Sequence, residues 1–206
     1  MDEARSVREF WFGKLPLSPE ALSERMEFWF GEEAPQLAGD RDVQIRTRFG
    51  ELFERAASGQ LAHWADSPRR RLSLIILLDQ FPRNMFRGSA RAFAYDEKAL
   101  ALTLSGMQSG ADAALDAVER IFFYMPLQHA ESPEVQDESV AAYRRLLAEA
   151  PAELRASFAG VLEYAENHRS IIDRFRRFPH RNRLLGREST PAEEGWLRER
   201  VGRFGQ

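Results

Sequence analysis

The chain has 206 residues, of which 44% are hydrophobic and 30% are charged, and its formal net charge is −3. It contains no cysteine, which excludes disulfides, thiolate nucleophiles, cysteine-ligated zinc and iron–sulfur clusters. The composition is that of a globular protein large enough to bury its own core.

The beginning of the chain, MDEARSVREFWFG, carries acidic side chains at once and lacks the apolar run of a secretory signal peptide. The longest apolar stretch, Leu72–Leu78, is interrupted by Ser73 and is far shorter than the roughly 20 residues that span a bilayer. We therefore expect a cytoplasmic protein with no membrane segment. The near-neutral charge also argues against bulk electrostatic binding to nucleic acid.

Serine or threonine is followed directly by proline at four places along the chain. Each pair places a capping hydroxyl before a proline that suits the first helical turn. These pairs are Ser18-Pro19, Ser67-Pro68, Ser132-Pro133 and Thr190-Pro191. Three aspartates at comparable breaks are expected to be further helix N-caps. They are Asp40, Asp96 and Asp112.

Between these signals, apolar residues recur at helical spacing. One stripe runs from Ile45 to Ala56, and a longer one runs from Leu154 to Phe175 and includes His168. Strict alternation and hairpin turns are missing, and Leu72–Leu78 is interpreted as a central helix buried on all sides. The sequence therefore predicts an all-α protein, residues 1–206 forming a single domain in which helices pack as antiparallel neighbours.

Two short sequences occur twice. The segment EFWFG stands at residues 9–13 and again at 27–31. We interpret both copies as aromatic side chains that pack into the core, with a dimer interface as the alternative. A Phe-Pro sequence stands at residues 81–84 and again at 178–182. This second repeated sequence suggests two related helix–turn elements, as in helical repeat proteins.

Polar residues follow the most buried predicted helix: Asp79, Gln80, Arg83, Asn84 and Arg87. Asp79 and Arg83 are four residues apart and can pair along one helix face. Pro82 kinks or ends the helix and frees carbonyls of the preceding turn to bind something. A structural ion-pair cluster and a ligand-binding cluster both remain open, because buried ions are costly unless they are fully satisfied.

A second candidate follows Pro126, which lies inside an apolar helical stripe. His129 and Glu131 come after the expected kink, where a side chain can point into a cavity. Histidine has the ordinary pKa best suited to proton transfer near neutrality. A buried structural histidine is the alternative interpretation.

The third candidate is the basic segment from His168 to Arg187, which holds seven arginines between Arg169 and Arg187 against one aspartate. A solvated basic face, an anion-binding pocket that uses arginine forks and a nucleic-acid patch all fit this pattern. The shortage of lysine and of interleaved aromatic residues argues against the nucleic-acid patch.

Several segments resemble the bacterial domain of unknown function 924 family: LLDQFPRNMFRG, ARAFAYD, FFYMPLQHAE and HRSIIDRFRRFPHRNRLLGREST. The resemblance extends from the FWFG near Phe28 to the region of Leu197. It implies an all-α fold similar to tetratricopeptide repeats, a right-handed stack of antiparallel helix pairs. It implies no established activity, substrate or cofactor. Two positions depart from the family pattern: Ala130 replaces a serine, and Arg176 replaces a glycine, so that the local turn is expected to differ.

By motif match, the characteristic polar positions of the family fall on the three clusters. As catalytic candidates we take His129, Glu131, His168 and His180. As ligand-binding candidates we take Asp79, Gln80, Arg83, Asn84, Arg87, Arg177, Arg181, Asn182 and Arg187.

We therefore predict a polar pocket that binds a small anionic metabolite, with histidine or glutamate moving a proton if the site is catalytic. The alternative is a helical-repeat scaffold that binds an acidic peptide or protein partner. No recognised ligand spacing indicates a metal, and no motif indicates a cofactor. The prediction depends on whether the Phe-Pro elements and His129 meet in space.

Overall fold

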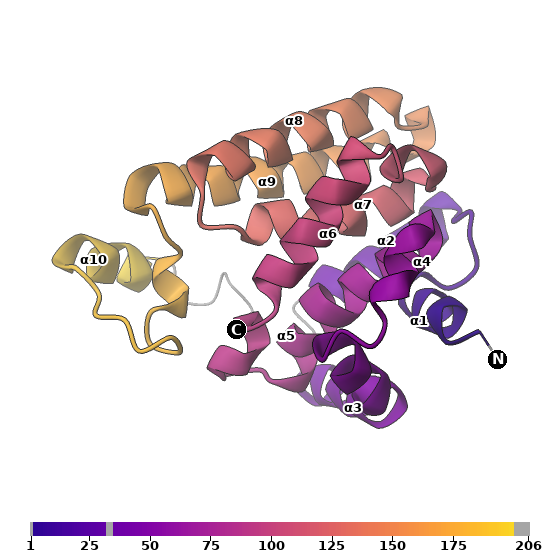
Figure 1. Ribbon diagram of the computed structural model, residues 1–206. Helices are drawn as coiled ribbons and strands as arrows, with labels where there is room; N and C mark the ends of the chain where they lie inside the picture. Colours follow the sequence, from indigo (N-terminus) through magenta and orange to yellow (C-terminus); the bar gives the residue numbers. More distant parts are fainter. Residues whose placement is uncertain (1, 32–34, 200–206) are drawn as a thin grey trace.

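The computed structural model describes residues 2–31 and 35–199, with no account of the side chains of residues 35–38. Every regular element in this part of the chain is helical (Figure 1), so the predicted all-α class is confirmed for it. The α-helices are α1 (Glu3–Phe12), α2 (Pro19–Phe30), α3 (Pro35–Ala57), α4 (Pro68–Ile75), α5 (Phe81–Met85), α6 (Asp96–Gln108), α7 (Ala117–His129), α8 (Pro133–Glu149), α9 (Arg155–Phe175) and α10 (Pro191–Glu199). The shorter helical turns are η1 (Ala62–Asp66), η2 (Ile76–Gln80), η3 (Ala90–Phe93), η4 (Asp112–Ala114), η5 (Ala152–Leu154) and η6 (Pro179–Arg181).

The four predicted starts at proline are confirmed, because α2, α4, α8 and α10 each begin at the proline of the pair. The hydroxyls of Ser18 and Ser132 accept hydrogen bonds from backbone N–H groups of their helices. Thr190 and Glu193 exchange two capping hydrogen bonds. Ser67 precedes α4 but makes no capping hydrogen bond with its side chain.

The three aspartate caps were wrong predictions. Asp40 lies inside α3, and Asp96 and Asp112 are the first residues of α6 and η4 rather than their caps. Asp96 illustrates the reason. Its carboxylate accepts hydrogen bonds from two guanidinium groups that are distant in sequence, and these charge-assisted bonds outcompete a local cap.

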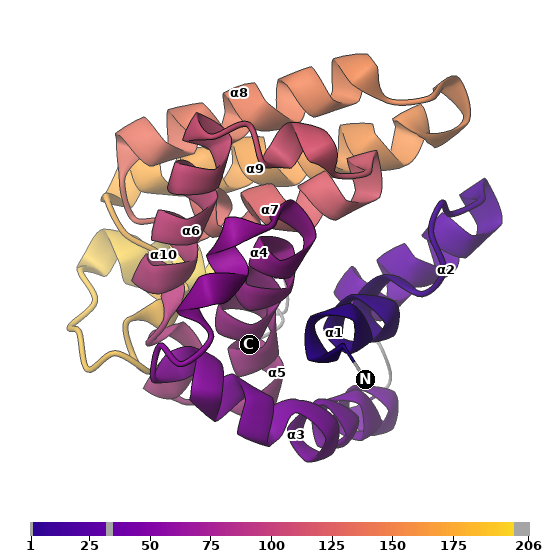
Figure 2. The same ribbon diagram turned by 45° about the vertical axis from the view of Figure 1, so that its right-hand side comes forward.

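The predicted central helix is confirmed. All residues of Leu72–Leu78 are buried, and they run through α4 into η2. This segment contacts α1, α6 and α7, while α7, α8 and α9 contact one another on the other side. Figures 1 and 2 show α8 and α9 lying side by side, with α7 between them and α4. The right-handed superhelix that the resemblance implies stays a prediction.

The two aromatic copies pack mainly into the core. The Trp11 and Trp29 rings both contact the ring of Phe122, at centroid distances of 5.5 and 4.6 Å. Nε1 of Trp29 also donates a hydrogen bond to the Trp11 carbonyl, at 3.0 Å. Phe30 differs from these residues, because it is 39% exposed at the end of α2.

Candidate functional site

Asp79 lies in η2, a single π-helical turn that joins α4 to α5. In this turn the Phe81 N–H bonds to the Ile76 carbonyl, five residues back, and Pro82 follows with no N–H to donate. The Asp79 side chain is completely buried. Single π-helical turns inside α-helices occur frequently at functional sites, and here the turn carries a carboxylate into the core.

The carbonyls beside this turn are bound by nearby side chains of the same segment. The Arg83 guanidinium donates to the Asp79 carbonyl, and Nδ2 of Asn84 donates to the Gln80 carbonyl at 3.0 Å. The sequence suggested that freed carbonyls could hold a ligand. The structure gives these two carbonyls to Arg83 and Asn84 instead.

The Asp79 carboxylate binds His129, which stands at the end of α7. Oδ1 of Asp79 lies 2.7 Å from Nδ1 of His129 and 3.4 Å from Nη1 of Arg83, and Gln80 donates to Oδ2. Burial alone would raise the pKa of Asp79, but the charge of Arg83, the contact with His129 and the hydrogen bond from Gln80 lower it to about 2. Asp79 is therefore an ionised hydrogen-bond acceptor at neutral pH.

This contact fixes the protonation pattern of His129. An ionised carboxylate only accepts hydrogen bonds, so Nδ1 carries the proton and Nε2 keeps its lone pair. Burial, followed by the charge of Arg83, lowers the pKa of His129 and keeps the ring neutral. The side chain is 12% exposed. His129 is thus an oriented neutral imidazole of the kind that accepts protons or binds ligands through Nε2.

Arg83 and Arg181 come from the two Phe-Pro sequences and meet at Asp96. Arg83 forms two hydrogen bonds with the Asp96 carboxylate, at 3.0 and 2.9 Å. Nη1 of Arg181 lies 3.3 Å from the same carboxylate and 3.1 Å from the His129 carbonyl. Segments nearly 100 residues apart in the chain therefore converge beside His129.

The local structures of the two Phe-Pro sequences differ, which corrects the expectation of related helix–turn elements. The first forms α5, whereas the second forms the 3-10 turn η6. The guanidinium of Arg181 lies 4.7 Å from the ring centre of Phe93 and 4.5 Å from that of Phe178. Burial lowers the pKa of Arg181 to about 10, so that it stays charged at neutral pH.

Glu131, which follows α7, binds the segment from Phe178 to Arg187 through hydrogen bonds. Its carboxylate accepts hydrogen bonds from Arg187 at 2.6 and 2.9 Å and from the Phe178 N–H at 2.8 Å. Nε of Arg187 donates to the Asn182 side chain at 3.0 Å. Burial raises the pKa of Glu131, but the hydrogen bonds from Arg187 and Phe178 outweigh it and lower the pKa overall.

The rings of His168 and His180 both lie beside that of Phe178. The His168 ring centre is 6.3 Å from that of His129 and 5.5 Å from that of Phe178. Nδ1 of His168 bonds to the Tyr164 carbonyl at 2.8 Å, so it carries the proton. Burial lowers the pKa of His168 to about 4 and that of His180 to about 3, which leaves both rings neutral.

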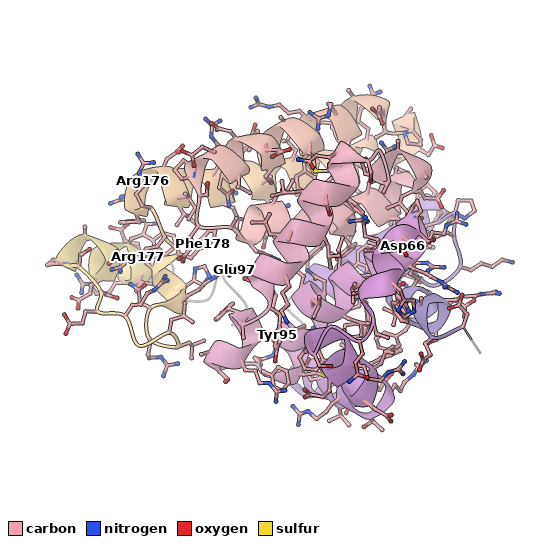
Figure 3. The ribbon with its side chains drawn as sticks, viewed as in Figure 1. Asp66, Tyr95, Glu97, Arg176, Arg177 and Phe178 are labelled. Carbon is pink, nitrogen blue, oxygen red and sulfur yellow. The ribbon has the colours of Figure 1, made fainter. Side chains whose placement is uncertain are left out.

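Two predicted ligand residues contact other parts of the molecule. Arg177 donates to Glu193 of α10 at 2.6 and 2.8 Å, and Arg87 binds Asp42 of α3 at 3.0 Å. Figure 3 shows Phe178 near the start of α6, while Arg177 lies farther out toward α10. Sequence spacing could not foresee this separation, because consecutive residues of a turn point in different directions.

Arg176 ends α9 with a φ of 58°. This left-handed conformation is the one that glycine adopts most easily at a helix C-terminus. The chain thus carries an arginine in a backbone conformation that suits glycine, and the expected difference from the family's turn stays a prediction.

The charges of the central cluster balance. Its three guanidinium groups, from Arg83, Arg181 and Arg187, face carboxylates, and its histidines are neutral. Three carboxylates complete it: Asp79, Asp96 and Glu131. Within the basic segment, Arg181 pairs with Asp96 of α6, and Arg187 pairs with Glu131, which follows α7. Part of the positive charge expected from the sequence is therefore neutralised in this cluster.

Two cavities lie away from this cluster. One is a cleft of about 780 Å³ at the end of α1, and the other is a hollow of about 550 Å³ between Arg174 and Glu193. Among the described residues, no group of three or more histidine, aspartate or glutamate side chains is placed to hold a metal ion. Within residues 2–31 and 35–199, none of the helices has both the length and the hydropathy needed to cross a bilayer.

The roles of Asp96 and Phe93 in the cluster were not predicted from the sequence. Both stand in ARAFAYD, a segment that contributed only to the family resemblance and to one helix cap. An acidic residue close to an aromatic residue is the available signal, because this combination is suited to receive a guanidinium group.

Fold and cluster together define an all-helical protein in which a buried carboxylate and several arginines surround a histidine. The family model of a bacterial protein of unknown function, DUF924, matches residues 7–200, and the chain belongs to this family. A solved structure, of a protein of unknown function from Agrobacterium tumefaciens, is 33% identical to the chain with a TM-score of 0.78. The match covers 96% of this chain and 97% of that one. No curated protein matches the sequence.

Proposed function

We propose that the protein binds a small anionic molecule, bearing a carboxylate or a phosphate, next to His129, and that His129 exchanges a proton with it. The observation that carries the proposal is the hydrogen bond of 2.7 Å between the buried Asp79 carboxylate and Nδ1 of His129. It orients the imidazole and leaves Nε2 as the basic atom. No described residue donates a hydrogen bond to this Nε2.

The electrostatic environment of His129 supports acid–base chemistry. When Nε2 takes a proton, the imidazolium that forms lies against an ionised Asp79, and this contact stabilises it. Before the transfer, burial and Arg83 favour the neutral ring. The two effects oppose each other, which is the arrangement that tunes a base for use near neutral pH.

Arg181 supports recognition of an anion. Nη1 of Arg181 donates hydrogen bonds to Asp96 and to the His129 carbonyl. Its Nε atom is buried and has no acceptor among the described residues. Nε atoms of Arg71, Arg120 and Arg169 share that feature, so this atom alone decides nothing. Arg181 differs in its position, because its guanidinium is held between two rings beside the oriented histidine. The residues that would hold the ligand are thus Arg181 and His129, with His168 as their neighbour.

The proposal is tested by titrating the protein with malonate and with inorganic phosphate, while the side-chain signals of His129 and His168 are followed by NMR. We expect saturable shifts of both histidines with at least one of the two anions. Arg181→Met should weaken this binding about tenfold or more, since a charge-assisted contact is lost. Arg174→Met, on the outer end of α9, is the matched control and should leave it unchanged. Equal binding by all three proteins would contradict the proposed site, and so would the absence of any shift.

A further inference from the structure

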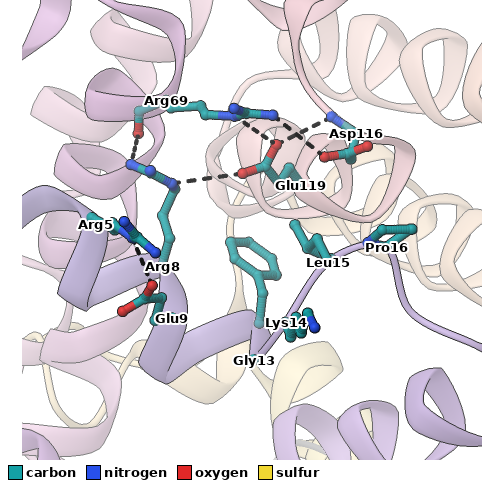
Figure 4. Close-up of a pocket in the computed structure, with 11 residues that line it drawn as sticks. Arg5, Arg8, Glu9, Gly13, Lys14, Leu15, Pro16, Arg69, Asp116 and Glu119 are labelled. Carbon is teal, nitrogen blue, oxygen red and sulfur yellow. Dashed lines mark hydrogen bonds and ion pairs between the residues drawn. The ribbon is translucent and has the colours of Figure 1, made fainter.

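A second region of the molecule has the properties of a ligand site. The cleft of about 780 Å³ is framed by the end of α1, the linker at residues 13–16 and the beginnings of α4 and α7 (Figure 4). Its size is within the usual range for small-molecule sites. Leu15 and Pro16 supply accessible apolar lining, and charged side chains supply most of the rest.

Glu119 is the buried polar group of this cleft. Its side chain is 2% exposed, although carboxylates are rarely buried without full pairing. Oε2 accepts a hydrogen bond from the Asp116 N–H at 3.1 Å. Oε1 lies 3.7 Å from Nε of Arg8, which is beyond hydrogen-bond distance. One oxygen of a buried carboxylate therefore accepts no hydrogen bond from the described residues.

Two cations that line the cleft have donors to spare. Arg69 approaches Asp116 and Glu119 only at 3.7 and 3.8 Å, and its guanidinium donates no hydrogen bond to a described residue. Lys14 is exposed at the rim. Arg8 differs, because its Nη1 is bound by the Arg69 carbonyl and by Ser73, at 3.1 and 3.2 Å. Arg8 is thus held in the wall of the cleft, whereas the guanidinium of Arg69 and the ammonium of Lys14, on different sides of the cleft (Figure 4), keep donors for an anion.

The combination selects a ligand that both donates and accepts. A plain anion would satisfy Arg69 but leave Oε1 of Glu119 without a donor. An ammonium group would satisfy Glu119, but it would lie close to the like charges of Arg8 and Arg69. A neutral hydroxyl avoids this repulsion and still donates to the carboxylate.

We infer that the cleft binds the phosphate monoester of a polyhydroxyl compound, such as a sugar phosphate. The phosphate group binds Arg69 and Lys14, and a hydroxyl group donates to Oε1 of Glu119. The carbon-bound hydrogens of the ligand pack on Leu15 and Pro16. Glu119 and His129 stand ten residues apart on α7, roughly 15 Å along the helix axis, so this site is independent of the proposed function at His129.

Calorimetric titration of the full chain with glucose 6-phosphate, glucose and inorganic phosphate tests the inference. The wild type should bind glucose 6-phosphate more tightly than either of the other two compounds. Arg69→Met should weaken binding of both phosphate-bearing probes about tenfold or more. Arg70→Met, at the exposed neighbouring position outside the cleft lining, is the matched control and should leave all three affinities unchanged.

Glu119→Gln tests the hydroxyl contact. It should weaken the affinity for glucose 6-phosphate several-fold and leave the affinity for inorganic phosphate unchanged. A glutamine can still accept the Asp116 N–H. If this variant does not fold, Lys14→Ala and Arg69→Met still test the proposed phosphate contacts, because both positions are exposed and their substitution should leave the fold intact. Failure of the wild type to bind glucose 6-phosphate would overturn the inference. Equal affinity for phosphate and glucose 6-phosphate, or binding lost in Arg181→Met but kept in Arg69→Met, would do the same.

Discussion

Replacing Asp79 by asparagine removes the charge at the centre of the cluster while keeping the side-chain shape. The folded-state pKa of Asp79 is about 2, against an ordinary value of 3.8. By proton linkage this difference contributes about 2 kcal/mol of folding stability at pH 7. Asp79→Asn should therefore lower the free energy of unfolding by about 2 kcal/mol or more, since it also leaves Arg83 and His129 short of a partner.

The sign of the pH dependence follows from the same two pKa values. A lowered carboxyl pKa stabilises the fold above the unfolded value of 3.8, and this stability is lost as the pH falls toward 2. By linkage, about 1 kcal/mol of it is already lost at pH 3. The stability gap between the wild type and Asp79→Asn should narrow by that amount between pH 7 and pH 3.

The assay is urea unfolding of both proteins at the two pH values, followed by circular dichroism. Asp137→Asn is the matched control, because its carboxylate pairs with Arg169 at 2.7 Å while 59% of its side chain is exposed. Such exposed pairs contribute little, about 0–1 kcal/mol. A loss of stability at pH 7 as small for Asp79→Asn as for Asp137→Asn, or a stability gap that does not change with pH, would show that the cluster does not stabilise the ionised Asp79.

Three further predictions concern the end of α9, a close helix contact in α6 and a second buried histidine. Arg176→Gly should raise the free energy of unfolding by about 1 kcal/mol, because it relieves a left-handed backbone; lower stability in urea would contradict this. Gly106→Ala should cost about 1–3 kcal/mol, because a Cβ there would lie 2.5 Å from Phe123, whereas Gly50→Ala meets open space and should be neutral or stabilising in thermal melts. The lowered pKa of His168, about 4 against 6.5, means that the unfolded state takes up the proton first as the pH falls. The wild type should therefore lose stability between pH 6.5 and 4, and His168→Phe should lose less; parallel profiles would exclude this role of His168.

Much of the fold could be predicted because its signals are local. Ser18-Pro19 and Thr190-Pro191 start helices by capping chemistry, which needs no tertiary partner. The stripe from Ile45 to Ala56 is buried because its period matches the helix. The π-helical turn at Ile76–Gln80 was not foreseen, since it depends on how the buried segment continues through Pro82.

The partners within the cluster could be predicted only in part. Asp79, four residues before Arg83, gave a local signal for an ion pair, and the structure contains that pair at 3.4 Å. The contacts of Asp96 with Arg83 and Arg181 join residues 13 and 85 positions apart. Such contacts follow from packing of whole helices, and neither periodicity nor spacing encodes them.

The central claim is that buried Asp79 holds His129 as a neutral ring protonated on Nδ1, with Nε2 free to act as a base. Long-range ¹H–¹⁵N correlation spectra of the histidine side chains at pH 7 measure this directly, and the ring of His129 can be assigned with a His129→Gln variant. We predict a protonated Nδ1 and an unprotonated Nε2 in the wild type, and a loss of this preference in Asp79→Asn. A ring protonated on Nε2, or on both nitrogens, would contradict the account.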